Sequence, residues 1–176
     1  MAEPSEWVRR FAHLVPGGGT VLDLAAGGGR HARFSHGLGH PVVAVDRSLA
    51  GIADLAGVSG VELVEADIET DAWPLAERCF AGIVVTNYLY RPLLPRLAAS
   101  LEDGGVLIYE TFAIGQAEFG RPTNPDFLLR PHELIDVFRP LLSIVAYEQG
   151  IVATPRPAVI QRIVAVARTA PVGLQG

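Results

Sequence analysis

The stretch TVLDLAAGGGR, residues 20–30, decides the fold of this chain. It begins as a short run of β-branched and apolar residues, which is typical of a buried β-strand. The run breaks directly into three consecutive glycines, and residues 30–36 then suit a helix that ends at Gly37. A strand that passes through glycines into a helix lets the backbone approach a ligand closely and aims free helix N–H groups at it. The stretch therefore predicts a ligand-binding turn.

Asp23 is the charged residue inside this apolar strand. Burying a carboxylate is costly unless the carboxylate meets a partner. Two interpretations stay open at this point: Asp23 serves a bound ligand, or it caps the glycine turn as a structural residue.

Strands and helices alternate along the rest of the chain. Further strands are predicted at residues 41–46, 61–66, 81–86, 105–111, 142–148 and 158–167, and further helices at 4–14, 48–56, 92–101 and 132–138. This alternation indicates an α/β fold with a mostly parallel sheet. Residues 150–157 hold no helix, so the last two strands are expected to pair antiparallel, because a parallel crossover needs about a dozen residues.

Polar side chains stand at the carboxyl ends of successive strands. Asp46 ends the second strand about 20 residues after the glycines, where nucleotide-binding folds place an acid for ribose hydroxyls; a helix cap is the alternative. Asp67 and Ile68 follow the third strand, and Asn87 and Tyr88 follow the fourth. Ligands bind at the carboxyl ends of strands in open α/β sheets, so these side chains are expected to line one site.

Composition excludes several classes of protein. The chain has 176 residues, 49% of them hydrophobic and 19% charged, which favours a folded domain over disorder. The net charge of −5 and the absence of a basic run argue against nucleic-acid binding. No apolar run is long enough for a membrane span, and residues 1–12 lack the apolar core of a signal peptide. With Cys79 as its single cysteine, the chain is expected to be cytoplasmic.

The histidines do not predict a metal site. His36 and His40 are four residues apart, but glycines between them interrupt the helical face, and His13, His31 and His132 are scattered. The chain has no cysteine pair and no H-E-x-x-H motif, so no metal is expected. His31, at the start of the helix after the glycines, is expected to pack beside the ligand.

These features together resemble the class I S-adenosylmethionine-dependent methyltransferases over essentially the whole chain. The family's motif, acid-x-Gly-x-Gly-x-Gly, is matched by Asp23, Gly27 and Gly29, with Ala25 in place of the first glycine. Alanine is small, so slight tightening of the site is expected rather than its loss. The compact size and the helix ahead of the motif look more loosely like small bacterial enzymes related to tellurite-resistance methyltransferases.

The resemblance implies a single Rossmann-like methyltransferase domain over residues 1–176, with helices on both faces of a seven-stranded sheet. It implies S-adenosyl-L-methionine as cofactor and a small molecule as methyl acceptor. In this family the acids corresponding to Asp23, Asp46 and Asp67 lie near the methionine amino group, the ribose and the adenine amino group. The expected donor-binding residues are Arg10 (for the methionine carboxylate), Asp23, Ala25, Gly27, Gly29, His31, Asp46, Arg47, Asp67, Ile68, Asn87 and Tyr88.

Residues 113–130 show no clear periodicity and follow the fifth strand, where this family often places substrate-binding elements. They are expected to form a lid loop over the acceptor. Phe119, Arg121, Asn124 and Phe127 would supply an aromatic wall and one cation, which favours an anionic acceptor; a solvated loop is the alternative.

A general base is needed only for some acceptors, and the sequence does not choose one. The candidates are Tyr88, Tyr90, Glu110 and His132.

Two competing functions remain. Residues 27–32 also fit G-x-G-x-x-A, the dinucleotide fingerprint, so a short NAD(P)-binding oxidoreductase is the first alternative. The chain contains no lysine and therefore no catalytic Tyr-x-x-x-Lys pair, which argues against it. A non-catalytic module that only binds the methyl donor is the second alternative, because a fold alone does not determine a function.

Overall fold

The computed structural model describes residues 2–70 and 72–168. Its centre is a seven-stranded sheet with the order β3-β2-β1-β4-β5-β7-β6. The strands are β1 (Val21–Leu24), β2 (Val42–Asp46), β3 (Val61–Glu65), β4 (Phe80–Thr86), β5 (Leu101–Phe112), β6 (Ser143–Val152) and β7 (Ala158–Val166). Strands β1 to β5 pair in parallel, and β7 runs antiparallel between β5 and β6. The mostly parallel sheet with an antiparallel last strand is confirmed.

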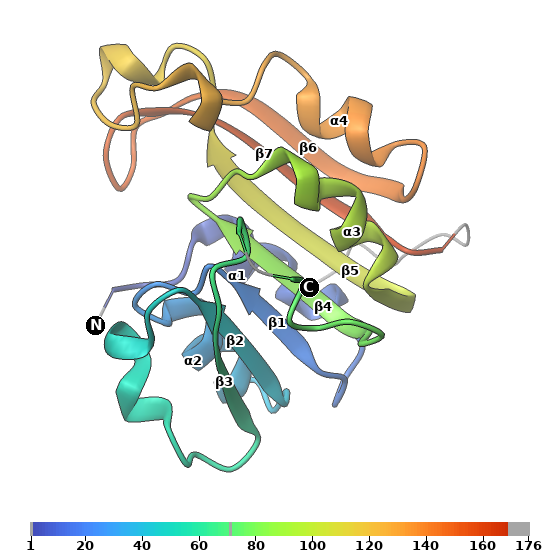
Figure 1. Ribbon diagram of the computed structural model, residues 1–176. Coiled ribbons are helices and arrows are strands. Elements are labelled where there is room, and N and C mark those ends of the chain that lie inside the picture. The colour runs from blue at the N-terminus through green and yellow to red at the C-terminus, as the bar shows by residue number, and fades with distance from the viewer. Residues whose placement is uncertain (1, 71, 169–176) are drawn as a thin grey trace.

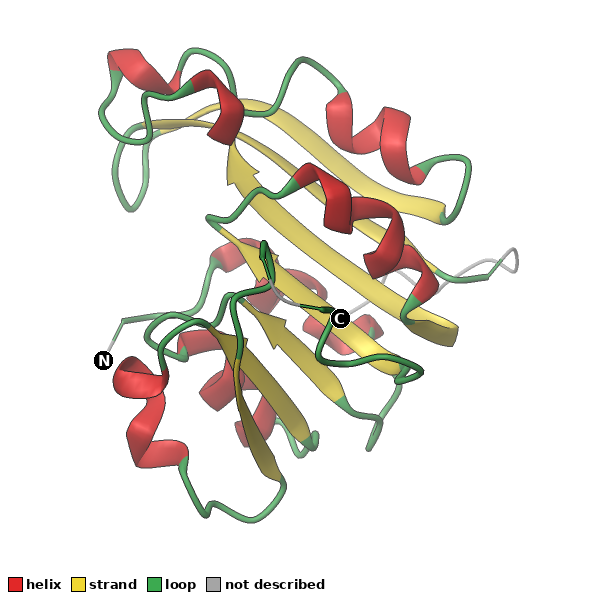
Figure 2. Cartoon of the chain, in the orientation of Figure 1, coloured by secondary structure: helices red, strands yellow, loops and turns green. Residues whose placement is uncertain are grey.

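Helices cover both faces of the sheet, as predicted (Figures 1 and 2). Helices α3 (Leu94–Ala99) and α4 (Glu133–Phe138) lie on one face, while α1 (Glu6–Phe11) and α2 (Arg30–Gly37) lie on the other. Short 3₁₀ turns complete the connections: η1 (Ala12–Leu14), η2 (Leu49–Leu55), η3 (Arg91–Leu93), η4 (Gln116–Glu118) and η5 (Pro125–Phe127). Within the described part of the chain, no helix has the length and apolar character needed to cross a membrane.

The central strands bury alternate side chains in two apolar layers. Leu22 of β1 packs in a cluster with Phe138 of α4, whereas its neighbour Val21 packs with Trp7 of α1 on the opposite face. Strands buried on both faces read as near-continuous apolar runs, which is how β1 and β4 appear in the sequence. The packed faces leave the carboxyl edge of the parallel strands, with its loops, as the place where polar side chains gather.

Two predicted helices differ from the structure. Within residues 48–56 the structure has the 3₁₀ segment η2 (Leu49–Leu55), which breaks at Ile52 (φ −132°), rather than a continuous α-helix. Glycine lowers helix stability by about 1 kcal/mol relative to alanine, and Gly51 packs so closely that an added Cβ would lie 2.6 Å from the Gly27 carbonyl oxygen. The predicted helix at 92–101 divides into η3 and α3, because Pro95 lacks an N–H, and β5 already begins at Leu101 beside Phe80.

The loop at residues 113–130 contains the 3₁₀ turns η4 and η5 but no α-helix or strand, and hydrogen bonds hold it in place. Its two ends pair through the Ile114 N–H to the Leu129 carbonyl, 3.0 Å. The side-chain oxygen of Gln116, which is 2% exposed, accepts the N–H of Val159 on β7 at 2.9 Å. The side-chain nitrogen of Gln116 donates to the Arg121 carbonyl at 3.3 Å. Contacts of this kind produce order without a periodic sequence pattern.

Candidate functional site

A cavity of about 810 Å³ opens at the carboxyl edge of the sheet. Seven of the expected donor-binding residues line it: Ala25, Asp46, Arg47, Asp67, Ile68, Asn87 and Tyr88. Three of the expected acceptor-binding residues line it too, namely Arg121, Asn124 and Phe127. The ends of four successive parallel strands and the 113–130 loop therefore meet around one cavity, as the strand-end rule predicts.

Asp46, the last residue of β2, forms a hydrogen bond to the glycine turn. The Gly27 N–H donates to Oδ2 of Asp46 at 2.8 Å, and the Ser48 N–H donates to Oδ1 at 3.1 Å. Asp46 therefore holds both the glycine turn and Ser48, the N-cap of η2, and it also forms part of the cavity wall. Because each carboxylate oxygen carries two lone pairs, these bonds leave capacity for the hydroxyls of a ligand.

Gly27 and Gly29 shape the turn without lining the cavity themselves. Both have left-handed backbones (φ 54° and 69°), which glycine adopts without a steric penalty. At Gly29 an added Cβ would lie 2.3 Å from Cγ2 of Ile52, so a larger residue does not fit there.

Two residues of the cavity wall other than glycine also have left-handed backbones. Ala25 (φ 54°) follows β1 directly and Asn87 (φ 56°) follows β4 directly, and both line the cavity. Asparagine tolerates this conformation, whereas alanine is strained by about 1–2 kcal/mol. Ala25 stands where the resembled motif has its first glycine, so the strain gives the physical reason for glycine at that position.

Asp23 lies in β1, the strand that precedes the turn, and does not line the cavity. Its Oδ2 accepts the N–H of Ala32 in the first turn of α2 at 2.8 Å, and the residue is 2% exposed. Burial raises the pKa of Asp23 to about 7, although the Ala32 hydrogen bond works in the opposite direction. The contact that the structure shows is the structural one, in which a strand carboxylate stabilises a helix N-terminus.

His31 links the N-terminal segment to the sheet behind the turn. Its Nε2 accepts the N–H of Ser5 at 3.1 Å, so Nδ1 carries the proton and faces Oγ1 of Thr86 at 3.4 Å. Burial, assisted by the charge of Arg30, lowers the pKa of His31 to about 3. The imidazole is therefore neutral, and it does not line the cavity.

Tyr88, which follows β4, forms a hydrogen bond to the segment that follows β3. Its hydroxyl donates to Oε1 of Glu69 at 3.1 Å, and Glu69 also lines the cavity. Burial, followed by the charge of Glu69, raises the pKa of Tyr88. The backbone carbonyl of Tyr88 accepts the hydroxyl of buried Tyr109 at 2.8 Å, which fixes the chain at this point. Tyr88 is thus a hydrogen-bond donor at neutral pH rather than a base.

Three candidates for the general base do not line the cavity. The Tyr90 hydroxyl donates to the Glu69 carbonyl at 3.0 Å. Glu110 faces the N-terminal segment, where its carboxylate accepts from Ser5 at 2.8 Å. His132 precedes α4, and its backbone N–H donates to Gln149 at 2.9 Å.

Arg10 and Phe119 also lie outside the cavity wall. Arg10 is exposed on α1, where its guanidinium lies 3.6 Å from Glu148 of β6 and over the ring of Phe11. Phe119 follows η4 directly and is 40% exposed. Within residues 2–70 and 72–168, no three His, Cys, Asp or Glu side chains are grouped so that they could hold a metal ion.

The cavity contains residues that the sequence analysis did not select. They are Ala66, Glu69, Thr70, Leu89, Thr111, Phe112, Pro122 and Thr123. Thr111 and Phe112 end β5 at the same edge as the other strand ends, so the rule used for β2 to β4 would have found them.

Comparison with known proteins places the fold. No family model and no curated protein matches the sequence. Among solved structures, TehB from Haemophilus influenzae superposes with a TM-score of 0.76 and 17% identity, over 96% of this chain and 63% of TehB. The chain thus spans less than two thirds of the length of TehB.

Two further structures are similar, and both contain S-adenosylhomocysteine. The glycopeptide N-methyltransferase MtfA superposes with a TM-score of 0.65 and 21% identity, over 95% of this chain and 91% of MtfA. The 1,6-didemethyltoxoflavin-N1-methyltransferase of Burkholderia thailandensis also holds 1,6-didemethyltoxoflavin. It superposes with a TM-score of 0.66 and 21% identity, over 93% of this chain and 76% of the methyltransferase. This chain therefore has the class I methyltransferase fold, and the resemblance seen in the sequence is confirmed at the level of the fold.

Substituting Ala25→Gly is expected to stabilise the protein by about 0.5–1 kcal/mol, because relief of strain outweighs the added flexibility of the unfolded chain. The thermal midpoint should rise by about 1–4 °C. Ala26→Gly is the matched control; its backbone is not left-handed, so this change should lower the midpoint. A decrease in both variants would contradict strain at Ala25.

Asp23 should make stability depend on pH. Its folded-state pKa is raised from 3.8 to about 7, so the folded protein binds this proton more tightly than the unfolded chain does. Stability contributed by the protonated group is accordingly lost as the pH rises through about 4 to 7. Asp23→Asn keeps an acceptor for Ala32 without a charge. Thermal midpoints of the unliganded proteins from pH 5 to 8 should fall more for wild type than for Asp23→Asn; parallel curves would contradict the shift.

Proposed function

We propose that this protein binds S-adenosyl-L-methionine and transfers its methyl group to a small-molecule acceptor. The observation that carries the proposal is the convergence of Ala25, Asp46, Asp67 and Asn87, from four strand ends, on one cavity. Similar structures with this fold are named as methyltransferases and hold S-adenosylhomocysteine. The composition, with its single cysteine, favours a cytoplasmic location for the reaction.

The residues of the donor half of the cavity fit this cofactor. Asp46 presents carboxylate oxygens for ribose hydroxyls, Asp67 and Ile68 offer an acceptor and an apolar surface for adenine, and Ala25 and Asn87 face the space between. When bound, the cofactor would supply a methyl group on a sulfonium, which leaves as part of a neutral thioether. The task of the chain is then to align the acceptor with that methyl group and to exclude water.

The acceptor half of the cavity combines aromatic surface with a cation. Phe112 and Phe127 supply the aromatic surface, and Arg121 supplies the charge. Arg121 forms no ion pair with any residue that the structure describes. An aromatic or apolar acceptor that carries an anionic group would match this wall.

The cavity favours an acceptor that needs no strong base. Tyr88 keeps its proton because its pKa is raised. The carboxylates that line the cavity are Asp46, Asp67 and Glu69, and Glu69 already accepts the Tyr88 hydroxyl. An attacking atom with a free lone pair, such as an amine nitrogen or a thiolate, requires only alignment.

The two alternative functions make different demands on the chain. An oxidoreductase has no support from the sheet, since β7 lies antiparallel between β5 and β6 as in the methyltransferase fold. A module that only binds the donor does not need the second wall that residues 121–127 build across the cavity.

Calorimetry with S-adenosylhomocysteine should show binding in the micromolar range, about −8 kcal/mol. NADH should bind at least a hundredfold more weakly, because Asp46, Asp67 and Glu69 line the cavity with charges that repel a diphosphate, and the glycine turn is not part of the cavity wall. Tight NADH binding without a response to S-adenosylhomocysteine would restore the oxidoreductase.

Asp46→Ala should lower S-adenosylhomocysteine affinity at least tenfold, since charge-assisted hydrogen bonds contribute about 1.5–3 kcal/mol each. The variant also frees the N–H groups of Gly27 and Ser48, so its thermal midpoint should fall as well. Asp103→Asn, at an exposed acid near the start of β5, is the control and should change neither quantity. Unchanged affinity in Asp46→Ala would mean that Asp46 only holds the backbone N–H groups of Gly27 and Ser48 and does not bind the cofactor.

A further inference from the structure

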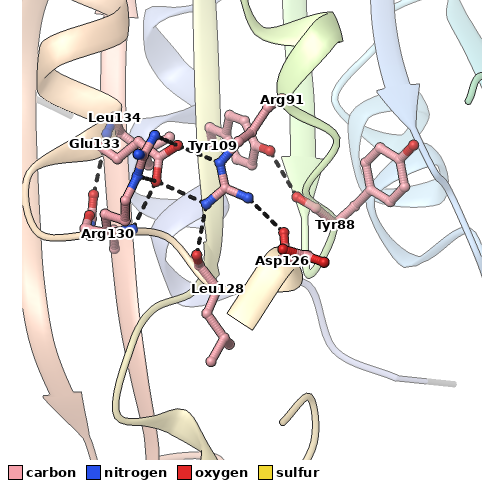
Figure 3. A network of polar contacts seen from close by, with 9 residues as sticks. Tyr88, Arg91, Tyr109, Asp126, Leu128, Arg130, Glu133 and Leu134 are labelled. Atoms are coloured by element: carbon pink, nitrogen blue, oxygen red, sulfur yellow. Dashed lines mark hydrogen bonds and ion pairs between the residues drawn. The ribbon is translucent and has the colours of Figure 1, made fainter. Parts of the chain in front are cut away.

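Arg91 lies shortly after the end of β4 and donates hydrogen bonds to Glu133 and to the 113–130 loop (Figure 3). It begins η3, three positions after Tyr88, and is not part of the cavity wall. Its Nε and one terminal nitrogen donate to the two carboxylate oxygens of Glu133 at 2.7 and 3.0 Å. The terminal nitrogens also donate to the backbone carbonyls of Asp126 at 2.6 Å and Leu128 at 2.8 Å. One guanidinium thus makes four hydrogen bonds to three residues.

Glu133, the first residue of α4, has a buried carboxylate. Its side chain is 7% exposed, and it also accepts the backbone N–H of Arg130 at 2.8 Å. Burial alone would raise the pKa of Glu133, but hydrogen bonds from Arg91 and Arg130 lower it to about 2. The ion pair with Arg91 therefore persists over the whole physiological range of pH.

The two carbonyls that Arg91 binds lie on either side of Phe127. Phe127 lines the cavity and is 49% exposed, so apolar packing alone does not determine its position. On the other side of Arg91, the Tyr88 carbonyl is held by the Tyr109 hydroxyl. Arg91 is accordingly the link between a fixed point of the β4 end and the backbone that carries an aromatic residue of the acceptor half.

We infer that Arg91 is a positioning residue that orients Phe127 against the acceptor, with Glu133 as the anchor of its guanidinium. That an acceptor binds beside Phe127 rests on the proposed function, whereas the hydrogen bonds of Arg91 to Glu133, Asp126 and Leu128 do not depend on it. The planar guanidinium reaches a carboxylate and two carbonyls at once, which the point charge of a lysine does not reproduce. Neither residue touches the donor half, so donor binding should not depend on them.

The inference is tested with protein that carries 4-fluorophenylalanine, observed by fluorine NMR. The Phe127→Leu variant assigns the Phe127 resonance. In Arg91→Lys that resonance should shift or broaden while the other six keep their positions, and amide exchange over residues 121–128 should become at least tenfold faster. Glu133→Gln, which keeps the size of the side chain, should produce the same changes in weaker form. Arg78→Lys is the matched control, because Arg78 forms a bidentate pair with Glu62 at another place on the surface.

S-adenosylhomocysteine affinity, measured on the same variants, separates the inference from the proposed function. Wild-type affinity should be retained within twofold in Arg91→Lys and Glu133→Gln. An unchanged Phe127 resonance in a folded Arg91→Lys variant would overturn the inference, and so would a loss of donor affinity equal to that of Asp46→Ala. If wild type itself fails to bind S-adenosylhomocysteine, the proposed function is lost, but the Phe127 resonance still decides whether Arg91 holds this wall.

Discussion

The bond between the Gly27 N–H and the Asp46 carboxylate, 2.8 Å long, holds the turn on which the cavity depends. Asp46, at the end of β2, binds the turn itself, while Asp23, within β1, accepts the N–H of Ala32 in the helix that follows the turn. Gly51 lets the neighbouring segment approach the Gly27 carbonyl. Two carboxylates and a close backbone contact therefore fix one short loop, and the strand ends on either side of it become the walls of the donor half.

The parts of this arrangement that depend on local pattern could be predicted from the sequence. Apolar runs located the strands, and the parallel topology then brought Asp46, Asp67 and Asn87 to one edge. The short connection at 150–157 indicated the antiparallel pair β6–β7. Such features need only the periodicity of a strand and the rule for strand ends.

The remaining features depend on tertiary contacts that no local pattern reveals. Arg10 stands on the expected helix, yet its guanidinium pairs with Glu148 of β6, far away in the sequence. Asp23 left two interpretations open because the partner of a buried carboxylate is visible only in three dimensions. The order of the 113–130 loop depends on Gln116 and Arg91, whose hydrogen bonds join distant segments. Strand ends thus build the donor half, whereas the acceptor half combines the end of β5 at Phe112 with a loop that side-chain hydrogen bonds hold in place.

The proposed function requires that the cavity support methyl transfer and not only donor binding. The most direct test incubates the protein with S-adenosyl-L-methionine labelled in the methyl group and a metabolite extract, followed by mass spectrometry of the small molecules. Label should appear in at least one acceptor, and S-adenosylhomocysteine should form in equal amount. At a donor concentration near the wild-type Kd, Asp46→Ala should form the labelled product about fivefold more slowly than wild type or slower still, because a tenfold loss of affinity leaves only about a tenth of the sites occupied. If the donor binds but no labelled product forms with metabolite extracts from several sources, methyl transfer is contradicted and a donor-binding module is favoured.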